Sequence, residues 1–166
     1  MRPTTSFRLT TALLALAVTT ACAETSTGVA RLSPPTDLDA PTLSAVRSAL
    51  QDEYHASAVY TAVMNQFGPV MPFVNIERAE RQHASSLAAL LSARGLPIPA
   101  AEPLSVVPTF SSASAACTAA AEAEVSNIAL YDRLLTGTVP SDVRRVFENN
   151  RRASLDNHLP AFERCR

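Results

Sequence analysis

Apolar residues recur in alternating steps of three and four along four stretches of the chain, which is the spacing of one buried helix face. The first predicted helix begins at Pro41, a favoured residue in a first turn, and ends before Gly68. The second opens at Pro72 and runs to about Arg94, where Gly95 caps it.

Two further helices are predicted in the C-terminal half of the chain. The third follows the serine-rich residues 111–114 and ends at Gly137. The fourth starts at Ser141 as its N-cap and continues to about Cys165, with Pro160 expected to bend it. The pattern therefore predicts an all-α fold, a four-helix bundle formed by residues 41–166.

The segment between the second and third helices is too rich in proline to be helical. Residues 96–109 contain four prolines. Extended at about 3.1 Å per residue, this segment is long enough to run back along a helix of about 33 Å. Such a long crossover is needed when the second and third helices are parallel.

Polar residues interrupt the apolar rows at repeated positions. Glu53 stands seven residues before Tyr60 in the first helix, and Glu124 stands seven before Tyr131 in the third. In a bundle, matched rows on two helices place these side chains in one interior layer.

The second and fourth helices add imidazoles to this layer. Glu80 and His83 are three residues apart on one face of the second helix. In the fourth helix, Leu155 and His158 have the same spacing. Leu155 and Arg151 are predicted to share the inner row of that helix with His158.

A buried carboxylate without a partner costs several kcal/mol or takes up a proton. Several carboxylates and imidazoles at interior positions of one small bundle multiply that cost. A divalent metal ion removes it, because carboxylate oxygens and neutral imidazole nitrogens are its ligands.

This pattern resembles the ferritin-like bundles that hold two metal ions between carboxylates, and within them the short bacterial proteins related to rubrerythrin. The resemblance implies up-down-down-up helices with a long crossover between helices 2 and 3. It implies iron or manganese as cofactor, O2 or peroxide as reaction partner, and these metal ligands: Glu53, Glu80, His83, Glu124 and His158. Tyr60 and Tyr131 would be hydrogen-bond donors to the ligands or electron carriers. Leu155 stands where the family has a fourth Glu, so an asymmetric or single-metal site is expected.

Length and net charge indicate a single domain and argue against nucleic-acid binding. The 166 residues suffice for one domain with a core, and 47% of them are hydrophobic. The net charge is −1 and no basic run is present, so nucleic acid is not expected as a partner.

The first 22 residues have the features of an export signal. Arg2 and Arg8 precede an apolar run at residues 13–18 that is too short to span a bilayer. Residues 23–40 are polar and proline-containing, which predicts a flexible tether.

Two ways of processing the signal fit the residues that follow it. Ala21-x-Ala23 is typical of ordinary signal cleavage, whereas Cys22 resembles a lipobox cysteine that would anchor the protein to a membrane. We therefore expect a protein that is either secreted or lipid-anchored in the cell envelope.

The other two cysteines are predicted to form a disulfide. Cys117 lies seven residues before Glu124, and Cys165 lies seven after His158. If the third and fourth helices are antiparallel and these ligands share a layer, the thiols meet at one end of the bundle. Export would permit their oxidation.

Two classes of function remain open from the residues alone. One is an exported metal-binding protein, with iron oxidation or peroxide consumption as the implied reaction and metal sequestration as a variant without turnover. The other is a metal-free structural or interaction module, in which Arg151 pairs with the buried Glu and His residues.

Overall fold

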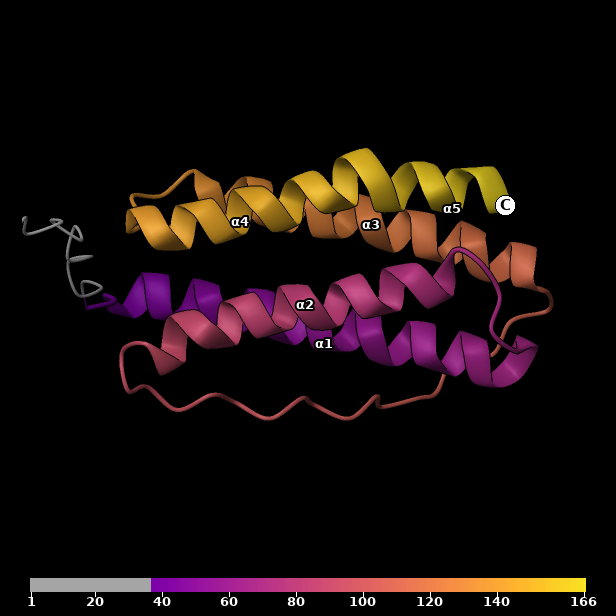
Figure 1. Cartoon of the computed structure of the whole chain (residues 1–166), viewed down its shortest axis with the longest axis horizontal. Coiled ribbons are helices and arrows are strands. Elements are labelled where there is room, and N and C mark those ends of the chain that lie inside the picture. Colours follow the sequence, from indigo (N-terminus) through magenta and orange to yellow (C-terminus); the bar gives the residue numbers. More distant parts are fainter. Residues whose placement is uncertain (1–36) are drawn as a thin grey trace, which may run out of the picture. The chain divides into compact units, whose positions relative to one another are not determined.

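The computed structural model describes residues 37–166 of the chain (Figure 1). These residues are helical with no strand among them, so the predicted all-α bundle is confirmed. The predicted signal peptide, with Cys22, and all but the last residues of the predicted tether lie outside the described range. The helices are α1 (Ala40–Phe67), α2 (Phe73–Ser92), α3 (Ala113–Leu135), α4 (Ser141–Ala153) and α5 (Leu159–Cys165).

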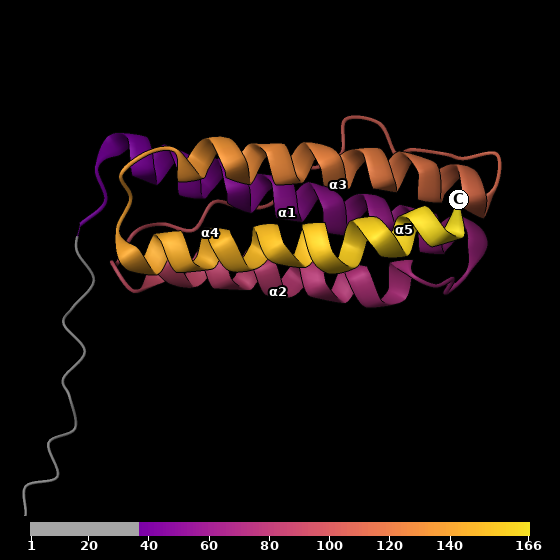
Figure 2. The same cartoon turned by 90° about the horizontal axis from the view of Figure 1, so that it is seen from above.

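The helices form a four-membered bundle in which α4 and α5 together occupy one position. Two perpendicular views show α1 beside α2 and α3, and the α4–α5 helix beside the same two neighbours (Figures 1 and 2). The α1–α4 and α2–α3 pairs therefore lie on the diagonals, and side chains from all four positions meet in the centre.

Local capping explains most of the helix ends. The Asp39 side chain accepts a hydrogen bond from the Thr42 amide (2.8 Å), so α1 begins one residue before the predicted Pro41. Gly68 ends α1 at a φ of 83°, which glycine adopts without strain. The predicted Ser141 cap is wrong, because Ser141 is the first helical residue and Pro140 takes the cap position.

The crossover between α2 and α3 follows α1. The Gln51 side chain donates to the Ala100 carbonyl (2.8 Å) and accepts from the Glu102 amide (3.1 Å). Farther along α1, Gln66 makes the same pair of bonds with the carbonyl and amide of Phe110 (2.7 and 3.0 Å). These paired bonds hold an otherwise irregular segment against the bundle.

A π-helical segment, η1 (Ser154–His158), joins α4 to α5. It ends two residues before Pro160, and the Leu159 amide donates to the Ser154 carbonyl, five residues back. Pro160 has no amide hydrogen to continue an α-helical ladder. The wider turn was not predicted, and it changes which side chains face the interior.

The predicted inner row of the fourth helix is therefore wrong at two positions. Leu155 is 40% exposed, and Ser154 is buried in its place. Arg151 binds Asp132 through its Nε (2.6 Å) near the surface, away from the buried carboxylates. In a π turn, residues four apart share a face, so Ser154 and His158 both point inward.

The interior consists of two apolar clusters separated by polar residues. One cluster contains Leu50, Leu87 and Phe147, and the other contains Tyr60, Phe73 and Phe162. Buried glutamates lie between the clusters on α1, α2 and α3, and buried polar residues do so on α4 and η1: Glu53, Glu80, Glu124, Asn150, Ser154 and His158.

At one end of the bundle, Cys117 of α3 and Cys165 of α5 lie at disulfide distance, with Cα atoms 5.9 Å apart, as predicted from their spacing. Among the described residues, no helix is both long and apolar enough to cross a membrane.

Candidate metal centre

Glu80 of α2 is the centre of the polar layer. Its Oε2 lies 2.9 Å from Nδ1 of His83, and its Oε1 lies 3.1 Å from Nδ1 of His158. One carboxylate thus faces two imidazoles, whose rings are stacked with centroids 5.3 Å apart.

A second carboxylate lies near the same nitrogen of each imidazole. Oε2 of Glu53 lies 3.4 Å from Nδ1 of His83, and Oε2 of Glu124 lies 3.5 Å from Nδ1 of His158. The layer therefore has two halves with the same donors: one imidazole nitrogen, one oxygen of an outer glutamate and one oxygen of Glu80. All five predicted ligands are brought together.

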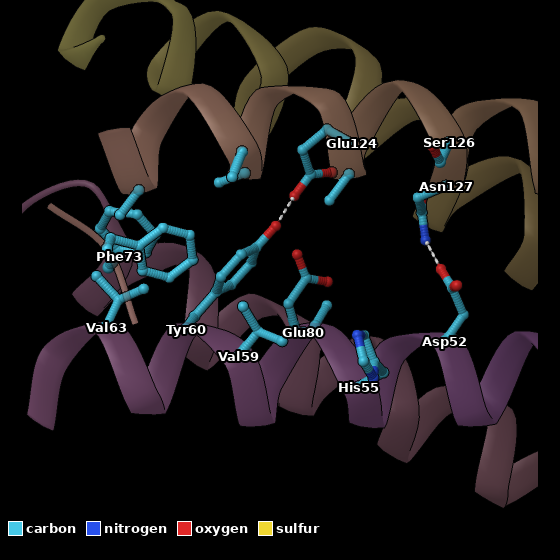
Figure 3. Close-up of a pocket in the computed structure, with 16 residues that line it drawn as sticks. Asp52, His55, Val59, Tyr60, Val63, Phe73, Glu80, Glu124, Ser126 and Asn127 are labelled. Carbon is cyan, nitrogen blue, oxygen red and sulfur yellow. Dashed lines mark hydrogen bonds between the residues drawn. The ribbon is translucent and has the colours of Figure 1, made fainter. Parts of the chain in front are cut away.

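Each outer glutamate is held by a tyrosine from another helix. Tyr60 of α1 donates to Oε1 of Glu124 on α3 at 2.8 Å (Figure 3). Tyr131 of α3 donates to Oε1 of Glu53 on α1, and Asn150 donates to the Tyr131 oxygen at 3.0 Å. Because each tyrosine binds Oε1 of the glutamate on the other helix, Oε2 of each glutamate remains directed toward an imidazole.

Two buried atoms of the layer have no well-formed hydrogen bond, namely Oε2 of Glu53 and Nδ1 of His158. Charged groups are nearby, but the directions do not match those of a hydrogen bond. Buried polar atoms that lack a well-directed hydrogen bond are costly. Both belong to the predicted ligands, and donor atoms of Glu80, His83 and His158 lie within 4.8 Å of one another. The residues present therefore fit a metal centre of carboxylate and imidazole ligands.

Burial and neighbouring charges shift the pKa values of the side chains in the layer. Burial raises the pKa of Glu53 to about 7, and the nearby charge of Glu80 adds to the rise. Burial lowers the pKa of His83, but Glu53 and Glu80 outweigh it and raise the pKa to about 9. Burial likewise opposes charge on His158, but Glu124 and Glu80 raise its pKa to about 10. In the metal-free protein both imidazoles are therefore protonated and positively charged near neutral pH. A bound metal ion would displace these additional protons.

The two tyrosines remain protonated in this environment. Burial, followed by the charge of Glu124, raises the pKa of Tyr60 well above its usual value. Burial and the charge of Glu53 do the same for Tyr131. Both hydroxyls consequently act as hydrogen-bond donors to the glutamates.

A second polar chain, not predicted from the sequence, lies beside the layer. Asn127 of α3 donates to Asp52 of α1 at 2.7 Å (Figure 3). Asn127 also accepts from the buried Ser154 hydroxyl at 2.9 Å. Asn127 follows Glu124 by three residues, and Ser154 precedes His158 by four. These sequence spacings could have indicated that Asn127 and Ser154 lie beside the layer. They are weak evidence, because Ser and Asn are common on exposed helix faces.

Two other polar residues of α1 and α2 lie outside the layer. Glu77 accepts from Ser57 (3.0 Å) and pairs with Arg81 (3.3 Å), so it does not reach the glutamates of the centre. His55 is exposed on α1.

No protein-family model matches the chain, and no curated protein is significantly similar in sequence. Two solved structures resemble it. A hypothetical protein from Methanococcus jannaschii is 22% identical, with a TM-score of 0.68 over 80% of this chain and 83% of that one. A conserved hypothetical protein from Mycobacterium tuberculosis is 20% identical, with a TM-score of 0.66 over 77% of this chain and 98% of that one. At these identities the likeness concerns the fold alone.

Proposed function

We propose that this protein is an exported, ferritin-like metal-binding protein that holds a pair of iron or manganese ions in the centre of its bundle. The observation that carries the proposal is the position of Glu80, whose two oxygens face two different imidazoles. One carboxylate shared between two otherwise equal donor sets is suited to bridging two cations.

The proposed ligands divide into two sets. Glu53 and His83 would hold one ion, Glu124 and His158 the other, and Glu80 would contribute an oxygen to each. Bound iron would supply redox chemistry toward O2 or peroxide, as in the ferritin-like resemblance. The protein's part is to orient the outer glutamates through the Tyr60 and Tyr131 hydroxyls and to surround the layer with apolar side chains.

We propose two equal positions in place of the asymmetric site expected from Leu155. That expectation assumed that Leu155 faces the ligands, whereas its side chain is 40% exposed. No carboxylate of α4 or η1 joins Glu80 among the buried residues of the described chain, so each ion would have only three protein ligands, one imidazole and two carboxylates.

The up-down-down-up order of a ferritin-like bundle is part of this proposal. It is supported by the crossover, which binds Gln51 first and Gln66 later and thus follows α1 from its beginning toward its end. Export is proposed from residues 1–22 alone. The paired Cys117 and Cys165 suit an oxidising compartment.

A metal-free structural module is the second candidate. It is favoured by the ion pairs within the layer, since two protonated imidazoles offset much of the charge of three glutamates. Arg151, which this alternative placed in the network, binds Asp132 instead.

Metal analysis and titration separate the two candidates. We expect the protein, purified without chelator, to bind about two equivalents of Fe(II) or Mn(II). Glu80→Gln preserves size but removes the shared charge, so it should weaken binding by more than about tenfold. Glu77→Gln is the matched control, because Glu77 is also buried on α2 but pairs with Ser57 and Arg81.

Two results would count against the proposal. Less than about a tenth of an equivalent of metal, or equal affinities of the two variants, would favour the metal-free module. If metal binds but Fe(II) oxidation in air is no faster than in buffer, the protein sequesters metal without turnover.

A further inference from the structure

A cavity of about 300 Å³ lies between α1 and α3, directly beside the polar layer (Figure 3). Glu80, Glu124 and Tyr60 line it on the side of the layer, while the exposed His55 and Ser126 lie on the side of the solvent. The cavity therefore connects the surface to the proposed metal centre. Its size is at the lower end of ordinary small-molecule sites.

A large part of the cavity wall is apolar, because α3 presents small side chains to the valines of α1, Val59 and Val63. Ala116, Ala119, Ala120 and Ala123 recur on one face of α3, opposite α1. Alanine fills little of the space between two helices, so a cavity remains between α1 and α3.

Three aromatic rings line the same cavity. Tyr60 and Phe73 pack edge to face, with ring centroids 5.6 Å apart. The third ring, Phe110, comes from the crossover, and Gln66 fixes its backbone through two hydrogen bonds. Aromatic rings favour an aromatic ligand through offset and edge-to-face contacts.

The polar wall selects the group that the ligand presents. Oε1 of Glu124 accepts one bond from Tyr60 and has a second lone pair, and the Tyr60 oxygen also has acceptor capacity. These groups favour a hydrogen-bond donor. An anion would lie against the carboxylates of Asp52, Glu80 and Glu124, because these line the cavity and the two protonated imidazoles do not. An ammonium group would lose its hydration among alanines.

We propose that this cavity binds a small neutral phenol, with its ring among the alanines and aromatic residues and its hydroxyl donating to Glu124 or Tyr60. A hydrated metal ion or peroxide does not require apolar walls of this extent. The inference extends the proposed function, because it places an organic molecule beside the metal positions. Binding to metal-stripped protein tests it independently of metal loading.

The experiment is calorimetric titration of the chelator-treated, exported protein with 4-ethylphenol. We expect saturable one-to-one binding. Ethylbenzene, which lacks the hydroxyl, should bind about fivefold more weakly, and 4-ethylbenzoate, which is anionic, at least about tenfold more weakly. These two comparisons measure the donor preference and the charge preference separately.

Cavity-blocking variants locate the site. Ala123→Phe places a ring at an exposed lining position and should weaken 4-ethylphenol binding at least about tenfold. Ala89→Phe, at an exposed position of α2 outside the cavity, is the matched control and should leave affinity within about twofold. Ala119→Leu is a second blocking variant, and thermal melts establish that each variant is folded.

Three outcomes would overturn the proposal. They are absence of saturable binding by 4-ethylphenol, equal binding by folded Ala123→Phe and Ala119→Leu variants, and tighter binding of 4-ethylbenzoate to metal-free protein. Because every arm uses metal-free protein, failure here leaves the metal titrations intact. Conversely, if the protein binds 4-ethylphenol but no metal, the metal proposal is refuted and the phenol proposal stands.

Discussion

Tyr60 and Tyr131 occupy equivalent places in the two halves of the polar layer. Each comes from one of the α1 and α3 helices and donates to the glutamate of the other. Each hydroxyl donates a hydrogen bond to Oε1 of the glutamate that it contacts, and this bond fixes the direction in which Oε2 points. At the scale of single residues, the tyrosines are positioning groups, and their proposed role in electron transfer stays a prediction.

Replacing Tyr131 by Phe should weaken metal binding. The change removes the hydrogen bond to Glu53 and leaves a buried carboxylate less well oriented, so we expect a loss of about tenfold or more in Mn(II) affinity. Competition with a chromophoric chelator measures it. Tyr54→Phe is the control, since Tyr54 packs against the apolar cluster of Leu50 and Leu87. Equal affinities of the two variants would mean that the hydroxyl does not position Glu53.

Replacing Leu155 by Glu tests the register of η1. If Leu155 faced the ligands, the new carboxylate would complete a fourth-glutamate site and strengthen metal binding. Its side chain is exposed, so we expect unchanged metal stoichiometry and a stability change within about 0.5 kcal/mol. A gain in metal affinity would show that the segment turns inward when metal is present. The measurement is the same titration, combined with thermal melts.

At the scale of elements, the ends of helices are tied to their neighbours by polar side chains. Arg94, just beyond α2, donates to the Leu90 carbonyl (2.9 Å) and pairs with Asp142 in the first turn of α4 (2.8 Å). This pair joins two helices at the bundle end opposite the cysteines. It should contribute a pH-dependent part of the stability.

Stability at this end should fall with acidification. Burial raises the pKa of Asp142, but the hydrogen bond and charge of Arg94 outweigh it and lower the pKa below its usual value. A lowered pKa contributes stability above the unfolded pKa, near 4, and that contribution disappears as the pH falls through the folded pKa. Asp142→Asn should therefore melt at a lower temperature than wild type at neutral pH, with the difference vanishing well below pH 4.

Thermal melts across this pH range test the pair. Glu148→Gln is the matched control, because Glu148 forms only an exposed pair with Arg144 at 3.9 Å on the same helix. Added salt should shrink the Asp142 effect, since the pair is partly open to solvent. A melting difference that persists unchanged in acid would assign the effect of Asp142→Asn to something other than charge.

At the scale of the whole described bundle, a polar layer divides the interior into two apolar clusters. The helices α1, α2 and α3 contribute to both clusters, whereas α4 packs in one and α5 in the other. Displacement of one helix would therefore disturb the polar residues that the others hold between the clusters. The Cys117–Cys165 pair ties α3 to α5 within one of these clusters. A covalent bond there restricts the separation of α3, which supplies Glu124, from α5, which directly follows His158.

The cysteine pair should contribute substantially to stability. The residues are 48 apart in sequence, for which the chain-entropy estimate gives about 4 kcal/mol. Denaturant unfolding of the Cys117→Ser/Cys165→Ser double variant measures this loss. Reductant should lower the unfolding midpoint of wild type toward that of the variant and leave the variant unchanged. Reactive Cys117 and Cys165 thiols in denatured, unreduced protein would refute the bond.

Much of the fold and the ligand set was predictable from the sequence, because helix periodicity and capping are local properties. The steps of three and four located the helices to within a few residues and placed Glu53, Glu80, His83 and Glu124 in interior rows. His158 was assigned correctly to the interior, but its neighbour Leu155 was not. The π turn before Pro160 depends on a backbone choice that side-chain periodicity does not encode.

The sequence by itself determined which residues are available for a metal centre, namely three glutamates and two histidines at repeated positions on four helices. Only the tertiary structure decided how they meet. Packing across the bundle brings both imidazoles next to Glu80 and lets each tyrosine of α1 and α3 bind the glutamate of the other helix. It also leaves a cavity beside these residues. These contacts join residues far apart in the chain, so they depend on how whole helices pack rather than on any local pattern.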